Sequence, residues 1–370
     1  TSILEIKNSE LQKVSNEGIY DFSYYSIGSL NDYVETNLVK GNRSSRSSKV
    51  VANKIHDISD HTGVFSVLNP GGLRYNYGIP VYNNGKIDEI VSVEARNDCA
   101  YKINAPVTLF SEATRTDIEF SDEYYKKSVY PSEVQNYLLT NILGTDYVDV
   151  DGVAGPSDGD NGYWVKFNYI KDEDYKWRAP FNGALYMPGS ELTGSDDKAS
   201  YTYGSRENYY LATAETKTHI AKFTMSERED AHGANNQHSN TTDLSMGKSS
   251  YRVDKIELFV KEKYHAAINS GSIPIALQTT HFSYSYALCP GVLNNSGNDY
   301  YDNISPTQLP NEGGKLTLKK VWTTYQNNDR GALSPYEFNY GSNKDFKENL
   351  YNRWGGYKEY GTDDCKNLQN

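Results

Sequence analysis

Aromatic side chains recur two residues apart throughout this chain, and this spacing limits the possible folds more than any other feature. Side chains alternate between the two faces of a strand, so a two-residue step places both rings on one face. In a helix the same two side chains would point about 200° apart. The spacing therefore predicts antiparallel strands, in which tyrosine covers half-buried faces while its hydroxyl meets water or a polar partner. The steps are Tyr20/Phe22/Tyr24, Tyr75/Tyr77, Phe167/Tyr169, Tyr201/Tyr203, Phe282/Tyr284/Tyr286 and Phe338/Tyr340.

The composition indicates a folded protein with thin cores. The chain has 33 Tyr against 11 Phe and 4 Trp, and aromatics reach 13% although the mean hydropathy is −0.72. Disordered chains have few aromatics, so disorder is excluded. A net charge of −11 argues against nucleic acid as a partner. No apolar run approaches the ~20 residues of a membrane-spanning helix, so we expect no membrane insertion.

We expect a mainly β fold of antiparallel meander sheets, such as a large sandwich or barrel, with one or two short helices and long polar loops. Residues 1–50 read as an entry segment that ends in a flexible loop, and residues 51–370 as one continuous β-rich region. A sub-domain break near 100–145 is the alternative. The widely spaced Cys99, Cys289 and Cys365 favour three buried free thiols, and one disulfide with a spare thiol stays open.

Local signals place turns and helices within this region. Asn69–Gly72 (NPGG) predicts a turn, and Asn84-Gly85 between two alternating runs predicts a hairpin. Apolar residues at helical spacing predict a short helix over Ser128–Leu143, with Gly144 as its C-cap. A further helical turn is predicted over 262–270, before Gly271.

The segment Asp146–Gly162 is the strongest candidate for a binding site. It sets four aspartates, Asp149, Asp151, Asp158 and Asp160, among glycines that allow tight folding around an ion. Calcium takes six to eight oxygen ligands at ~2.4 Å and suits such flexible carboxylate loops, whereas magnesium demands a stricter octahedron. The spacing differs from that of an EF-hand. A solvated acidic turn without an ion is the alternative.

A second acidic cluster, 172–174, lies next to two aromatic residues, Tyr175 and Trp177. Aromatic rings beside carboxylates predict a sugar-stacking surface. Paired carboxylates are also the catalytic groups of glycoside hydrolases, so a hydrolase site is a further alternative. Asp230, His232 and His238 form a further group that could hold a metal. A solvated or packed role is the alternative for each of these residues.

Motifs for other chemistries do not occur in the sequence. There is no GxSxG, no HExxH, no phosphate-binding GxxxxGK[ST] and no GxGxxG after a strand. Proximity in the fold could still supply a catalytic group. We therefore assign no catalytic residue, and the sequence favours a protein that is not an enzyme.

Several strings resemble one family. They include RYNYGIPVYN (74–83), NYLLTNILGTDYVDVDG (136–152), YSYALCPGVLNNSG (284–297), GGKLTLKKVWTTYQNNDRGALSPYEFNY (313–340) and YNRWGGYK (351–358). From about residue 70 onward the chain is similar to segments of very large secreted or cell-surface proteins of Bacteroidetes. Those proteins often carry RHS/YD-repeat-like β regions and are often substrates of type IX secretion. The resemblance implies an RHS-like shell, an extracellular or cell-surface location and no known catalytic residues.

These observations together predict a non-catalytic scaffold segment of a large exported protein, with calcium as its one candidate cofactor. Its partners would be other segments of the same polypeptide, and further candidates are surface glycans or the secretion machinery. An adhesion or glycan-binding module is the alternative function, and a glycoside hydrolase is the third.

Overall fold

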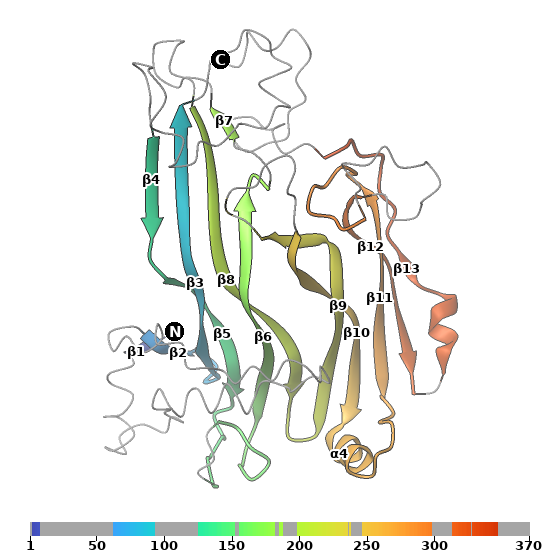
Figure 1. Ribbon diagram of the computed structural model, residues 1–370. Helices are drawn as coiled ribbons and strands as arrows, with labels where there is room; N and C mark the ends of the chain where they lie inside the picture. Colours follow the sequence, from blue (N-terminus) through green and yellow to red (C-terminus); the bar gives the residue numbers. More distant parts are fainter. Residues whose placement is uncertain are drawn as a thin grey trace.

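The chain folds into one large antiparallel β-sheet in the computed structural model (Figure 1). The structure describes residues 2–7, 62–92, 125–151, 155–181, 185–187, 198–235, 237, 246–297, 313–326 and 328–346. The strands are β1 (Ser2–Lys7), β2 (Thr62–Leu68), β3 (Arg74–Ser92), β4 (Tyr125–Tyr130), β5 (Glu133–Leu143), β6 (Trp164–Ala179), β7 (Leu185–Met187), β8 (Lys198–Glu215), β9 (His219–Ala234), β10 (Met246–Val260), β11 (Gln278–Leu288), β12 (Lys315–Tyr325) and β13 (Tyr336–Glu337). Helix α4 spans Lys261–Asn269, and the 3-10 helix η3 spans Asp329–Leu333.

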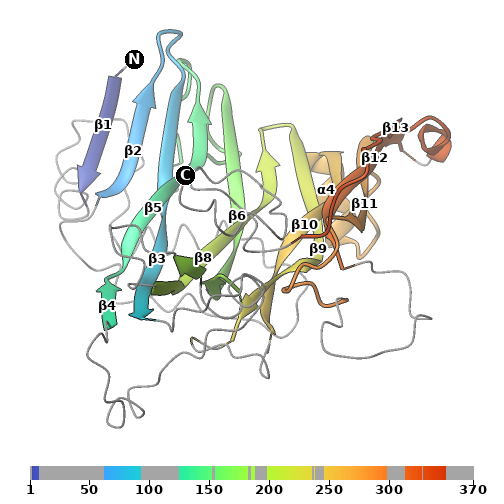
Figure 2. The ribbon, with the colours of Figure 1, turned by 90° about the horizontal axis from the view of Figure 1, so that it is seen from above.

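The strands follow one another in the order β1-β2-β3-β5-β6-β8-β9-β10-β11-β12-β13, while β4 pairs with β3 and β7 pairs with β8. Seen from above, they run from β1 on one side to β12 and β13 on the other (Figure 2). This architecture confirms the predicted mainly β, antiparallel fold. In the part of the chain that the structure describes, no helix is long and apolar enough to cross a membrane.

Most of the aromatic steps lie in strands, as predicted. Tyr75/Tyr77 belong to β3, Phe167/Tyr169 to β6, Tyr201/Tyr203 to β8 and the 282–286 step to β11. Tyrosine hydroxyls bond to backbone carbonyls of neighbouring strands, as when Tyr284 donates to Val253 (2.6 Å). The 338–340 step follows β13 instead of lying within it, and the 20–24 step lies outside the described residues.

One face of the sheet carries polar side chains that bond to each other across the strands. The β-ladder registers place Ser66, Asn76, Asn141, Lys166 and Glu215 in one row from β2 to β8, and the row ends on β9 at the buried, apolar Ile220. Hydrogen bonds join Ser66 to Asn76 (2.7 Å) and Asn76 to Asn141 (2.6 Å). Farther along this polar face, Thr224 bonds to Glu257 (3.2 Å). These polar pairs therefore hold neighbouring strands in register.

The opposite face is apolar. The registers align Val67 with Tyr75, Ile142 and Val165 at one side of the sheet, and Phe282 with Val321 and Tyr336 at the other. All of these side chains except Tyr336 are half-buried, and Tyr336 is exposed. The sheet thus has a polar face and an apolar face, as alternating strands require, and the apolar face is only partly covered.

Four strands, β3, β5, β6 and β8, pair in a closed circuit. Strand β3 pairs with β5 through Arg74–Asn83, β5 with β6, β6 with β8, and β8 returns to β3 through Asn83–Ser92. At Lys86–Val91 strand β3 pairs with both β4 and β8, so these two must lie on its opposite edges. The circuit buries both faces of β3, where Ile79, Val81 and Tyr82 are all buried.

The helix predicted over 128–143 is wrong, because strands β4 and β5 occupy this segment. Its apolar residues are three or four apart because β5 contains β-bulges. Ile142 pairs with Tyr75 and Leu139 with Tyr77, so an extra residue, Thr140, stands between them. A bulge shifts the alternation of faces by one residue and thereby imitates helical spacing.

The hairpin predicted at Asn84-Gly85 is also wrong, since β3 continues through both residues. Gly85 has a φ of +131° and lies at a register shift between β3 and β8, so the glycine permits a bulge instead of a turn. The turn at 69–72 is confirmed, with Gly72 donating to the Asn69 carbonyl (3.0 Å) between β2 and β3. Helix α4 confirms the second predicted helix.

Cys289 is a free, half-buried thiol. Cys99 and Cys365 lie outside the described residues. The same holds for the entry segment, 1–50, apart from β1, and for residues 100–124 of the predicted break. Strand β1 pairs with β2, so the entry segment contributes one strand to the sheet.

Candidate metal-binding site

The acidic loop, residues 144–163, joins β5 to β6 at one end of the sheet. Its two ends meet where Gly144 donates to the Tyr163 carbonyl (2.8 Å), and an isolated bridge pairs Val148 with Asn161. Gly162 has a φ of +83° and lies so close to Asp146 that a Cβ would come within 2.1 Å of its carbonyl oxygen. The sequence therefore needs glycine at 162 for the loop to close.

Asp160 organises the loop from within. Its carboxylate is fully buried (0% exposed) and accepts three hydrogen bonds. Oδ1 accepts from the Val150 amide (3.0 Å), and Oδ2 accepts from the Ser157 amide (2.9 Å) and the Tyr147 hydroxyl (2.8 Å). Burial, and then the hydrogen bond to Asp160, raise the pKa of Tyr147. This buried carboxylate is therefore satisfied by the protein itself.

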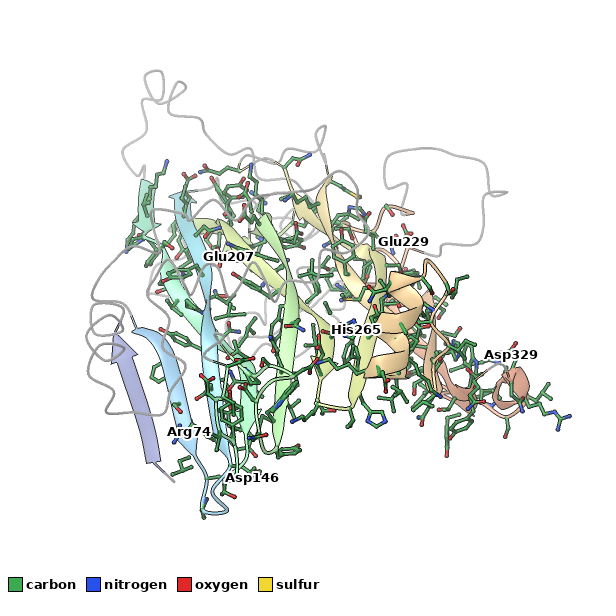
Figure 3. The ribbon with its side chains drawn as sticks, turned by 90° about the horizontal axis from the view of Figure 1, so that it is seen from below. Arg74, Asp146, Glu207, Glu229, His265 and Asp329 are labelled. Carbon is green, nitrogen blue, oxygen red and sulfur yellow. The ribbon has the colours of Figure 1, made fainter. Side chains whose placement is uncertain are left out.

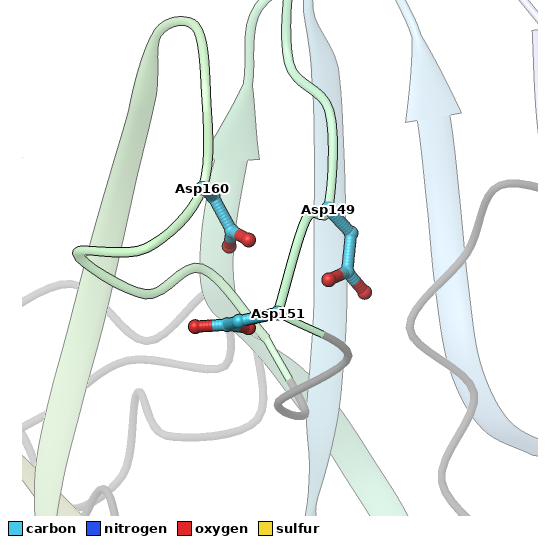
Figure 4. A group of neighbouring side chains, drawn as sticks. All are labelled: Asp149, Asp151 and Asp160. Carbon is cyan, nitrogen blue, oxygen red and sulfur yellow. The ribbon is translucent and has the colours of Figure 1, made fainter.

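Two further aspartates approach Asp160. Asp149, Asp151 and Asp160 each offer a carboxylate oxygen, and these three oxygens lie within 4.8 Å of one another (Figure 4). Two ligands of one calcium ion at ~2.4 Å from it would lie at most about 4.8 Å apart, so the spacing suits calcium. Asp149 and Asp151 are exposed, and Asp151 also accepts a hydrogen bond from Ser157 Oγ (2.5 Å).

Asp158, the fourth predicted ligand, lies outside this group. Its Oδ1 pairs with Lys261 Nζ (2.7 Å), which also contacts Glu215 (3.2 Å). Lys217 donates to the Asp160 carbonyl (2.8 Å), and Lys166 to the Pro156 carbonyl (3.2 Å). Three lysines therefore hold the loop against the end of the sheet.

Sequence reasoning missed these lysines because they come from β6, the β8–β9 turn and the start of α4. Only the strand pairing brings them to the acidic loop, and no local pattern marks them. Burial lowers the pKa of Lys166, and the nearby positive charge of Lys261 also lowers it, while Glu215 acts in the opposite direction.

The acidic loop can therefore close on hydrogen bonds and lysine contacts alone, and calcium stays a prediction. If the ion binds, it must stabilise the folded state. We expect millimolar calcium to raise the thermal midpoint by a few degrees, since a ligand at 100 times its Kd adds about 2.7 kcal/mol and each 1 kcal/mol corresponds to roughly 1–2 °C in a chain of this length. The measurement is a pair of melts in calcium and in EDTA.

The Asp149→Asn/Asp151→Asn variant is the control, because it removes two exposed ligands and leaves Asp160 bonded. Its midpoint should not respond to calcium. An unchanged midpoint in the unsubstituted protein would contradict the calcium prediction.

Of the two residues predicted to stack on sugars, Tyr175 is buried and Trp177 is half-buried. Tyr175 is only 7% exposed, donates to the Ala231 carbonyl (3.1 Å) and has the Arg206 guanidinium 5.2 Å from its ring centroid. The Trp177 ring packs on Gly204, where a Cβ would come within 3.0 Å of it. These packed positions do not suit a sugar platform, which needs an open ring face.

The neighbouring acidic cluster is neutralised by lysines. Asp172 pairs with Lys248 (3.2 Å), Glu173 with Lys171 (3.2 Å), and Asp174 with Lys176 (3.8 Å). Asp174 also has a φ of +59°, which fits the irregular pairing of β6 and β8 at this point. The three carboxylates therefore form separate ion pairs, an arrangement that gives no support to a hydrolase site.

Asp230 is bound by protein groups. Its buried carboxylate takes two hydrogen bonds from Arg228 (3.0 and 2.9 Å) and one from the Leu316 amide (2.8 Å). His232 Nδ1 instead contacts the Gly247 carbonyl (3.2 Å). His238 lies outside the described residues. The arrangement thus fastens β9 to β12 through hydrogen bonds within the protein.

Asp230 gives a pH prediction. Burial alone would raise its pKa, but the hydrogen bonds from Arg228 and Leu316 outweigh burial and hold the pKa below its usual value. A carboxyl with a lowered folded-state pKa stabilises the fold above its unfolded pKa of about 3.9, and this contribution is lost as the pH falls further.

We therefore expect Asp230→Asn to lower the free energy of unfolding at neutral pH, and the difference from the unsubstituted protein to shrink below about pH 4. Urea unfolding at several pH values measures this. A difference that does not change with pH would contradict the role given to the ionised carboxylate.

Comparison with known protein families, with characterised proteins and with solved structures found no match for this chain.

Proposed function

We propose that this chain is a non-catalytic structural segment of a larger exported or cell-surface protein, with the acidic loop as a candidate calcium site. The observation that carries the proposal is the polar face of the sheet. There the strands are linked by hydrogen bonds between side chains such as Asn141 and Asn168, which are themselves buried, so the links are shielded from competing water and hold the sheet in one shape.

The energetics agree with this role. Cross-strand pairs contribute roughly 0.2–1 kcal/mol each, so a sheet of this breadth can gain several kcal/mol from pairs alone. Asn168 shows the arrangement, since its amide donates to both Thr213 (2.7 Å) and Glu215 (2.7 Å). The stabilisation from these pairs is distributed along the sheet and does not depend on one site, which suits a scaffold.

The apolar face supports contact with other parts of the same polypeptide. Its half-buried rings and aliphatic side chains gain stability when apolar surface covers them, at about 25 cal/mol per Å². The extracellular location, the membership in a larger protein and the passage through a secretion system rest on the sequence resemblance.

Two experiments test the proposal. The reading frame that encodes this chain should extend beyond it and include an export signal, and a short frame without one would contradict the proposal. The chain should also melt at a higher temperature when it is produced with its flanking segments than alone. Equal midpoints would show that no neighbouring segment covers the sheet.

An adhesion or glycan-binding module is the second candidate, and a different surface favours it. Tyr336 is 78% exposed, and Phe338 and Tyr340 nearby are also exposed. Exposed aromatic faces can stack on sugars. Glycan-array binding that falls with Tyr336→Ala and Tyr340→Ala would support this function, and a flat result across arrays would count against it.

A further inference from the structure

A lysine and a glutamate are buried together inside the four-strand circuit. Lys171 Nζ of β6 lies 2.8 Å from Glu207 Oε1 of β8, and the two side chains are only 5% and 1% exposed. Lys171 pairs with Tyr209 in the ladder, two residues from Glu207, so the facing strands place the amine beside the carboxyl. Glu207 lies in the middle of the sheet and not at its rim (Figure 3).

Two donors and a second carboxyl surround this pair. Glu207 Oε2 accepts a hydrogen bond from the Tyr82 amide (3.2 Å) and a longer one from the Tyr209 hydroxyl (3.5 Å). Glu173 Oε1 lies 3.2 Å from Lys171 Nζ. The Glu207 carboxyl thus has one oxygen held by donors and the other facing an amine, and a third group, the 38% exposed carboxylate of Glu173, lies beside the amine.

The burial of Lys171 and Glu207 favours a reaction between these two groups. Burial of two ions is costly, and a proton passing from the ammonium to the carboxylate leaves a neutral amine and a neutral acid that pay no such penalty. Fixing the two groups in contact also supplies the high effective concentration that a bimolecular reaction lacks.

We propose that Lys171 and Glu207 become joined by an amide bond. The Nζ lone pair attacks Cδ, and the Tyr82 amide and the Tyr209 hydroxyl stabilise the negative charge that develops on Oε2. The Cδ–Oε1 bond then breaks. Oε1 leaves as water with the carboxyl proton and one amine proton that Glu173 relays, so no oxidant or co-reactant is needed. The bond links β6 to β8 covalently.

A second lysine–glutamate pair with the same N–O distance provides a comparison in an exposed setting. Lys255 and Glu257 also lie 2.8 Å apart, but their side chains are 37% and 17% exposed. Water reaches both side chains of this pair, so the burial that favours the proposed reaction is missing there. The Lys255–Glu257 pair is therefore the internal control.

Intact mass spectrometry of the folded, then denatured chain tests the proposal. We expect the mass to fall below the sequence mass by one water, and trypsin to leave Lys171 uncut in a peptide joined to the one that contains Glu207. Cleavage after Lys255 should be normal. The full sequence mass in the folded protein would overturn the proposal.

Two variants separate the covalent bond from a structural ion pair. Lys171→Arg keeps the positive charge but cannot form the amide, so its mass should equal its sequence mass in protein that circular dichroism shows to be folded. Glu173→Gln keeps both reacting groups and removes the proton relay, so the loss of water should become incomplete at early times. An equally rapid loss in Glu173→Gln would remove Glu173 from the reaction, and a loss of water in Lys171→Arg would overturn the proposal.

Discussion

Replacing Asp160 by alanine should destabilise the protein by about 3–4 kcal/mol, because three donors lose a buried, charged acceptor at once. Hydrogen bonds to charged groups are worth roughly 1.5–3 kcal/mol each, and the exposed position of Val150 allows water to replace part of the loss. Urea unfolding in the presence of EDTA measures the effect without any contribution from bound metal.

Asp149→Ala is the matched control, since it removes an exposed carboxylate from the same loop. It should change the free energy of unfolding by less than about 0.5 kcal/mol, as surface substitutions do. Equal losses in Asp160→Ala and Asp149→Ala would show that the buried carboxylate does not organise the loop.

Gly162→Ala should have a comparable effect for a different reason. A Cβ at 162 would lie 2.1 Å from the Asp146 carbonyl oxygen, and the residue would also hold a φ of +83°. Overpacking costs typically 1–3 kcal/mol and a left-handed backbone about 1–2 kcal/mol, so we expect a loss of about 3 kcal/mol in a urea titration.

Gly271→Ala separates these two causes. Gly271 has a similar φ of +71°, but a Cβ there would meet nothing within 4 Å. It should therefore show the backbone cost alone, about 1 kcal/mol. If both alanine variants lost the same stability, the close approach of the two ends of the loop would not matter.

The sequence predicts the fold class because the aromatic steps report strand alternation directly. It fails where a bulge breaks that alternation. In β5 the bulge at Thr140 changes the two-residue alternation of a strand into an apparently helical spacing. In β3 the Asn84-Gly85 pair, which predicts a hairpin, forms a bulge within a continuous strand. A bulge depends on the partner strand, so a single segment carries no sign of it.

The candidate site was predictable only in its local part. The sequence marks the aspartates of the acidic loop, but not that Asp160 is buried while Asp149 is exposed. It also cannot show that Asp158 forms an ion pair with Lys261 instead of joining the other aspartates, because Asp158 and Lys261 are far apart in the chain. Pairing between distant strands decides these contacts, and the buried Lys171–Glu207 pair arises in the same way.

The central claim is that one continuous sheet, linked across its polar face, forms the body of this protein. Hydrogen exchange of the intact chain in native buffer tests it most directly, because amides of a cooperative sheet open together. We predict slow exchange with similar protection in β3, β5, β6 and β8 to β12. Strong protection confined to β9–β12, with β3 to β8 exchanging as fast as an unstructured peptide, would contradict the claim.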